Sequence, residues 1–166
     1  PKDIEWHFIG KLQSNKCKTL VKGVPNLHVV ETVDTVKLAN KLNNACESVS
    51  RDKPLRVFVQ VNTSGEESKS GCTPKDCVGV VKHVTSSCKN LRFVGLMTIG
   101  RYGDTTSDCF KVLCACRDDV LKHVDLPEDT QKNFEMSMGM SGDFPLAIEC
   151  GSTNIRVGSS IFGART

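Results

Sequence analysis

The segment HVVETVDTVKLANKLNNACESVSRDKPLRVFVQV (residues 28–61) decides the fold, because it places one helix pattern between two strand patterns. Residues 28–33 and 55–61 are rich in β-branched and aromatic side chains, which favour strands. Between them, apolar residues recur at the spacing of a helix: Val36, Ala39, Leu42 and Ala45. Two strands joined by a helix pair in parallel, since a parallel neighbour needs a long crossover.

The same alternation runs along the rest of the chain. Four further strands are expected at 5–10, 91–97, 134–138 and 154–157, and helical spacing recurs at 77–84 and 110–120. Helix starts are indicated by Thr73 before Pro74 and by Asp143 before Pro145, and helix ends by Gly23 with Pro25 and by Gly151. Six strands alternating with helices predict an α/β fold.

The number of units bears on the choice between a barrel and an open sheet. A (β/α)8 TIM barrel takes about 250 residues, or about 31 per unit. Six units in 166 residues take about 28 each, so the unit size fits a barrel and the count is two short. An open doubly wound sheet also fits the pattern, but no GxGxxG follows a strand. No linker or repeat divides residues 1–166, so we expect a single domain.

Composition excludes several classes of protein. The formal net charge of +3 is too small to indicate a nucleic-acid partner. Apolar residues make up 39% of the chain, which excludes disorder, and the apolar runs are too short to span a membrane. The nine cysteines form no CxxC pair, so we expect free thiols in a reducing cytosol, with a metal or redox site as the less favoured alternative.

Two loops near the carboxyl end are the strongest candidates for ligand binding. In α/β folds, ligands gather at the carboxyl ends of the strands, and residues 137–143 and 156–163 follow the last two expected strands. Both loops combine glycines with hydroxyl side chains, among them Ser137, Ser141 and Ser159, which suits a phosphate. The alternative is two glycine-serine turns without a ligand.

Four other residues are candidates with plainer alternatives. Arg156 alternates with its apolar neighbours and therefore faces a carboxylate such as Glu135 or Glu149, a ligand, or solvent. Asn62 either contacts a ligand or caps a turn at the end of its strand. His7 is expected to be a hydrogen-bonded core histidine, and Met97 is expected to pack.

Six stretches together resemble the pyridoxal-phosphate homeostasis proteins, which look like the barrel domain of alanine racemase without its second domain. The stretches are WHFIGKLQSNK (6–16), HVVETVD (28–34), VFVQVNTSGEESKSG (57–71), FVGLMTIG (93–100), MSMGMSGDFPLAIECGST (136–153) and IRVGSSIFGAR (155–165). They follow the family's order over nearly the whole chain.

The resemblance implies a (β/α)8 barrel that binds pyridoxal 5′-phosphate and handles its supply without turnover, in the cytoplasm or in mitochondria, as a monomer when full length. Arg156 matches the arginine that faces the pyridine nitrogen. Gly158 and Ser159 match the phosphate-binding backbone, and Ser137 and Ser141 match the other side of the phosphate. Asn62, Met97 and His7 match inward positions near the cofactor. The implied partner is the small-molecule cofactor, and neither nucleic acid nor membrane.

One family feature is absent. The family's Schiff-base lysine lies at the end of the first barrel strand, whereas this sequence opens at what resembles the third. We therefore expect a fragment of a longer chain whose upstream units carry that lysine, and we do not assign Lys11 as a substitute. No catalytic residue is predicted within this chain.

Two other functions are compatible with the sequence. One is a fragment of a pyridoxal-phosphate-dependent racemase or decarboxylase, although racemases of this fold need a second domain and its tyrosine, and this chain has Tyr102 alone. The other is a phosphate-binding barrel without the cofactor.

Overall fold

The computed structural model describes residues 3–101, 103 and 106–163, so Tyr102 lies outside the described residues. The described part contains one sheet of six strands in the order β1-β2-β3-β4-β5-β6. The strands are β1 (Trp6–Phe8), β2 (Leu27–Val33), β3 (Leu55–Gln60), β4 (Leu91–Met97), β5 (Glu135–Met140) and β6 (Asn154–Arg156). Every neighbouring pair is parallel, which confirms the α/β prediction and the six units.

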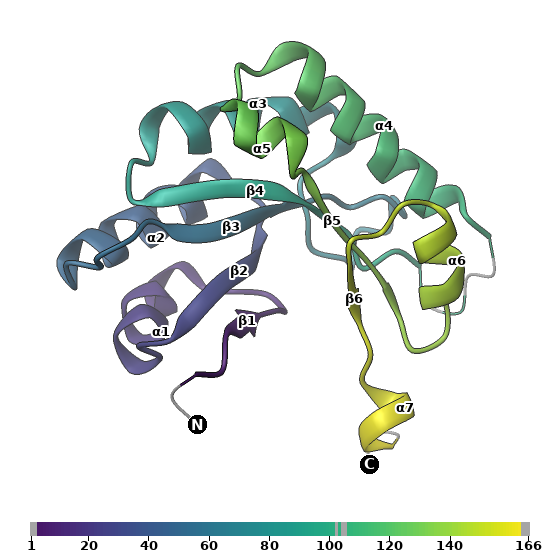
Figure 1. The fold of residues 1–166 in the computed structure, drawn as a ribbon, viewed down its shortest axis with the longest axis horizontal. Coiled ribbons are helices and arrows are strands. Elements are labelled where there is room, and N and C mark those ends of the chain that lie inside the picture. Colours follow the sequence, from purple (N-terminus) through teal and green to yellow (C-terminus); the bar gives the residue numbers. More distant parts are fainter. Residues whose placement is uncertain (1–2, 102, 104–105, 164–166) are drawn as a thin grey trace.

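Helices connect the strands along the chain. They are the 3-10 turn η1 (Ser14–Lys16) and the α-helices α1 (Cys17–Gly23), α2 (Val36–Ser48), α3 (Pro74–Ser87), α4 (Asp108–His123), α5 (Glu128–Lys132), α6 (Phe144–Glu149) and α7 (Ser159–Phe162). Figure 1 shows the sheet curving into part of a barrel, with α2, α3 and α4 on its convex side. A closed barrel needs eight strands, and the six described here match the sequence prediction of a partial (β/α)8 barrel.

Strand boundaries differ from the predictions by a few residues. The first strand is limited to Trp6–Phe8, and the last stops at Arg156, because each of these strands pairs along one edge only within the described sheet. The fifth strand extends to Met140, two residues further than expected. Gly139 permits that extension, since its φ of 97° is a conformation that side chains rarely adopt.

The predicted helix boundaries are mostly confirmed. The Thr73 side chain accepts a hydrogen bond from the Asp76 backbone N–H, and Pro74 opens α3. Asp143 precedes α6, but its carboxylate accepts from the Met140 backbone N–H instead of capping the helix. The sequence pattern missed α5 and α7, which are too short to show a helical period.

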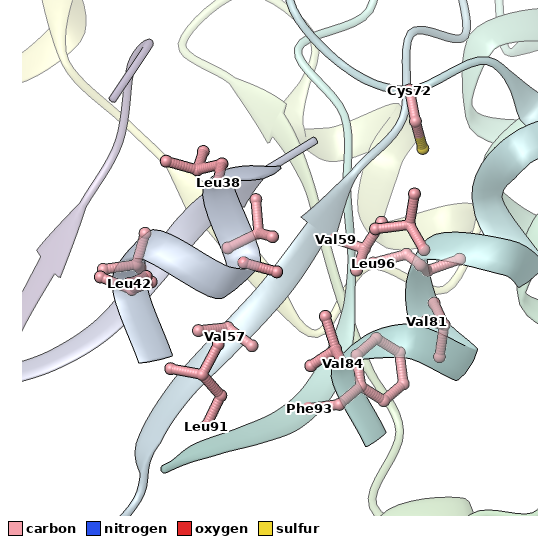
Figure 2. Packing of buried hydrophobic residues seen from close by; sticks show 14 of the residues in the cluster. Leu38, Leu42, Val57, Val59, Cys72, Val81, Val84, Leu91, Phe93 and Leu96 are labelled. Atoms are coloured by element: carbon pink, nitrogen blue, oxygen red, sulfur yellow. The ribbon is translucent and has the colours of Figure 1, made fainter. Parts of the chain in front are cut away.

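The main core lies between the sheet and its helices. Figure 2 shows side chains of α2 and α3 packed against side chains of β3 and β4. The labelled members are Leu38, Leu42, Val57, Val59, Cys72, Val81, Val84, Leu91, Phe93 and Leu96. Burial of apolar side chains stabilises by about 1.5–3 kcal/mol each, so this layer supplies most of the driving force for folding.

A second and smaller apolar cluster packs apart from that layer. It consists of Val29, Phe58, Val94 and Met97, with Ile99 packed against it. Its members come from β2, β3 and β4, which places an apolar surface beside the polar residues considered below. Met97 is 1% exposed, so the expectation that it packs is confirmed.

The described part contains free cysteines and helices of moderate length. All nine cysteines are free thiols, seven of them buried. Within the described ranges, no group of three or more His, Cys, Asp or Glu side chains is placed to hold a metal ion. Likewise, none of the described helices is long and apolar enough to cross a membrane.

Gly95 is required where β4 meets β5. A Cβ atom on Gly95 would lie 1.9 Å from the Glu135 backbone oxygen, and neither backbone can yield without separating the strands. We expect Gly95→Ala to lower the free energy of unfolding by at least about 1–3 kcal/mol, measured by urea denaturation. Gly79→Ala is the matched control, because Gly79 lies in α3 with open space around it. That change should stabilise by about 0.5–1 kcal/mol, and a Gly95→Ala protein as stable as this control would contradict the argument.

Candidate functional site

The Arg156 side chain is held among the strand ends by two hydrogen bonds. Its guanidinium donates to the Ser137 hydroxyl at 2.6 Å and to the Thr98 backbone oxygen at 2.7 Å. These partners belong to β5 and to the residue after β4, so the arginine of β6 reaches across two neighbouring strands. The sequence left three orientations open for Arg156, and the one in which its side chain faces solvent is therefore wrong.

Neither carboxylate suggested by the sequence is the partner of Arg156. Glu135 forms an ion pair with Arg56, and Glu149 is exposed at the end of α6. The carboxylate nearest in the hydrogen-bond network is Glu31, whose Oε2 accepts from the Ser137 hydroxyl at 2.5 Å. Ser137 therefore connects Glu31 to Arg156.

Glu31 is the residue that sequence reasoning missed. It is 1% exposed, in the middle of a strand whose other residues are mostly apolar. A carboxylate in such a strand was the available signal, because a buried charge needs partners. Its second oxygen, Oε1, lies 2.7 Å from His7 Nδ1.

The network favours charged forms of both ends. Burial alone would raise the pKa of Glu31, but hydrogen bonds from His7 and Ser137, with the charges of Arg156 and His7, bring that pKa below its ordinary value. Burial lowers the pKa of Arg156, while the charges of Glu31 and Asp143 oppose that effect. Glu31 is therefore a carboxylate at neutral pH, and Arg156 a guanidinium.

His7 connects this network to a second one. Its ring stacks on that of His28, with centroids 5.7 Å apart, and its side chain is 34% exposed because β1 lies at an edge of the sheet. His28 in turn lies 2.7 Å from the Arg56 guanidinium, and burial, followed by the Arg56 charge, lowers the pKa of His28. The prediction of a hydrogen-bonded histidine is confirmed, whereas its placement in the core is wrong.

The two glycine-serine loops converge. The Ser141 hydroxyl accepts hydrogen bonds from the backbone N–H of Gly158 at 3.0 Å and of Ser160 at 3.3 Å. Close packing of α6 on β5 allows this approach, since a Cβ atom on Gly139 would lie 2.6 Å from the Ala147 Cβ. The loop after β5 thus contacts the start of α7 through the Ser141 hydroxyl oxygen.

Asn62 is engaged in its own loop. Its side-chain amide donates to the backbone oxygens of Glu66 and Lys69, and its Oδ1 accepts from Ser64 and Gly65. Of the two alternatives for Asn62, these contacts correspond to the turn cap.

A hollow among the described residues lies elsewhere. It has a volume of about 480 Å³ and is lined in part by Lys22, Arg51 and Lys53, which lie before β2 and β3 begin. Ligands of parallel α/β folds bind at the opposite, carboxyl ends of the strands. We therefore place the candidate site at Arg156 and the two loops.

Comparison with known proteins shows the family of the chain. The alanine racemase N-terminal domain matches residues 8–166. The pyridoxal phosphate homeostasis protein of Homo sapiens is 47% identical over 167 residues, which cover 98% of this chain and 59% of the human protein. Its namesake in Schizosaccharomyces pombe is 46% identical, covering 99% of this chain and 67% of that protein.

Solved structures show the same fold. PipY of Synechococcus elongatus, solved with PLP bound, matches with a TM-score of 0.79 and 28% identity over 97% of this chain and 71% of that one. An alanine racemase of Clostridium difficile shares the fold at a TM-score of 0.69 with 13% identity, over 96% of this chain and 41% of the racemase. The chain spans about three fifths of the length of the human relative. With the domain match extending over nearly all of its length, the chain belongs to the family of the alanine racemase N-terminal domain.

Proposed function

We propose that this chain provides part of a pyridoxal 5′-phosphate site and that the whole protein binds and supplies the cofactor without turning over a substrate. The names of its relatives and the PLP-bound PipY structure support the ligand. The observation that carries the proposal is the Arg156 guanidinium, fixed by Ser137 and Thr98 beside two converging loops.

Arg156 suits the ring nitrogen of the cofactor. Its guanidinium only donates hydrogen bonds and keeps its charge, so it would donate to an unprotonated pyridine nitrogen and disfavour protonation there. When bound, the cofactor supplies an electron sink, and an unprotonated ring is a weaker one. A storage and delivery role is therefore better matched to this arginine than catalysis.

The loops suit the phosphate. Gly158 and Ser160 direct backbone N–H groups at the Ser141 oxygen, and a phosphate oxygen is the same kind of acceptor with more charge. Ser159, between them, and the Ser141 hydroxyl complete the polar set.

The remaining residues would act indirectly. Ser137 would act by holding Arg156, His7 by contacting Glu31, and Met97 by providing apolar packing. Asn62 would act by shaping its loop. The cytoplasmic or mitochondrial location and the monomeric state stay predictions.

Arg156→Gln tests the ring end of the site. We expect binding of pyridoxine 5′-phosphate to weaken at least about tenfold, because hydrogen bonds to charged groups contribute about 1.5–3 kcal/mol. Binding is followed by calorimetry and by fluorescence of Trp6, the single tryptophan, which is 49% exposed beside His7. Arg117→Gln is the matched control, since Arg117 pairs with its neighbour Asp118 on α4. Equal affinity of both variants would refute the assignment of Arg156.

Ser141→Asp tests the phosphate end. The new carboxylate would still accept from Gly158 and Ser160, but it would place a negative charge where the phosphate is proposed to bind. We expect Ser141→Asp to bind pyridoxine 5′-phosphate at least about tenfold more weakly than the neutral Ser141→Asn control, as charge repulsion in a partly buried site costs more than 1.4 kcal/mol. The two variants should bind unphosphorylated pyridoxine alike. Matching affinities for the phosphate ester would place the phosphate elsewhere.

A further inference from the structure

We infer that Glu31 is a positioning residue for the cofactor site: through the Ser137 hydroxyl it fixes the Arg156 guanidinium and supplies the buried negative charge that balances it. The inference rests on the proposed function in one respect, namely that the ligand of Arg156 is the ring nitrogen of the cofactor. The contacts themselves are between residues of this chain.

The direction of each hydrogen bond follows from Glu31. An ionised carboxylate only accepts, so the Ser137 hydroxyl must donate its one hydrogen to Glu31 Oε2. The lone pairs of Ser137 Oγ then remain for the Arg156 N–H at 2.6 Å. Glu31 therefore orients Ser137 as an acceptor for the arginine.

The connection spans strands that do not pair. Glu31 belongs to β2 and Ser137 to β5, which are separated in the sheet by β3 and β4. The Glu31 side chain consequently crosses the concave side of the curved sheet. Register shifts occur in β2 next to Glu31 and in β5 next to Ser137, and such irregularities often re-aim side chains at functional sites.

Arg156 has few other sources of negative charge. Besides Glu31, the carboxylate that acts on it is Asp143, whose Oδ1 already accepts from the Met140 backbone at 2.6 Å. Removing one of two opposite charges that are joined through a buried hydrogen bond leaves the other uncompensated. Without Glu31, the guanidinium would be expected to leave its position or to bind an anion from solution.

A ligand-free measurement tests the positioning directly. In NMR spectra of the ligand-free whole protein, the Arg156 Nη–H protons should exchange slowly with water and give separate signals in the wild type. In Glu31→Gln, rotation of the guanidinium should average these signals. Thr32→Val is the control, because Thr32 is equally buried next to Glu31 and its hydroxyl has no hydrogen-bond partner. Slow, resolved Arg156 signals in a folded Glu31→Gln protein would overturn the inference.

The pH dependence of stability gives a second ligand-free test. The groups facing Glu31 are His7 from β1, Ser137 from β5 and the Arg156 charge from β6. The native pKa of Glu31 lies below its ordinary value of 4.5, so its stabilising effect is complete above pH 4.5 and is lost as the pH falls through that lower value. The stability difference between wild type and Glu31→Gln should therefore shrink below pH 4.5. A pH-independent difference would contradict an ionised Glu31.

A ligand pair extends the test to the cofactor. Pyridoxine 5′-phosphate is compared with its analogue in which C–H replaces the ring nitrogen, and the wild type should prefer the former. Glu31→Gln should reduce this preference at least about tenfold, and Thr32→Val should keep it. Should Glu31→Gln fail to fold, Ser137→Ala breaks the same connection and should reduce the preference equally.

Three outcomes are distinguishable. An unchanged preference in a folded Glu31→Gln protein overturns the role toward the ligand. Absence of a preference in the wild type contradicts the proposed contact of Arg156 with the ring nitrogen, and the NMR result then decides whether Glu31 positions Arg156. Loss of both the preference and the slow Arg156 signals supports the inference.

Discussion

The hydrogen-bonded chain from Glu31 through Ser137 to Arg156 is the interaction on which the site depends. It places a buried carboxylate and a guanidinium on opposite sides of one hydroxyl and joins β2, β5 and β6, of which β2 pairs with neither of the others. Buried charges cost several kcal/mol unless they are paired and hydrogen-bonded. The same contacts that satisfy Glu31 therefore also fix the direction of Arg156.

Two apolar clusters surround the polar network. Helices and sheet bury the main core on the convex side, and Val29, Phe58, Val94 and Met97 form a separate cluster. Packing on both faces of the sheet maintains its curvature, and this curvature brings the polar residues of β2, β5 and β6 together. The close approach of β4 and β5 at Gly95 sets the spacing between Thr98 and Ser137, both of which accept hydrogen bonds from Arg156.

In the proposed function, the Arg156 guanidinium would face the cofactor ring and the N–H groups of Gly158 and Ser160 would face its phosphate, which is an arrangement for binding. In that function, Arg156 would weaken the ring as an electron sink, so the proposed site would be better suited to holding the cofactor than to using it. Within the family of the alanine racemase N-terminal domain, this chain matches proteins named for pyridoxal phosphate homeostasis over nearly all of its own length.

The sequence by itself determined the α/β class, the six strands and the two glycine-serine loops, because period, turn residues and alternation are local properties of the chain. The resemblance to known motifs supplied the cofactor. Only the tertiary structure decided that Glu31 and not Glu135 or Glu149 is the carboxylate connected to Arg156, and that Asn62 is engaged in its own loop. Glu31 and Ser137 are separated by 106 residues, and their contact arises from the curvature of the sheet, which no local pattern encodes.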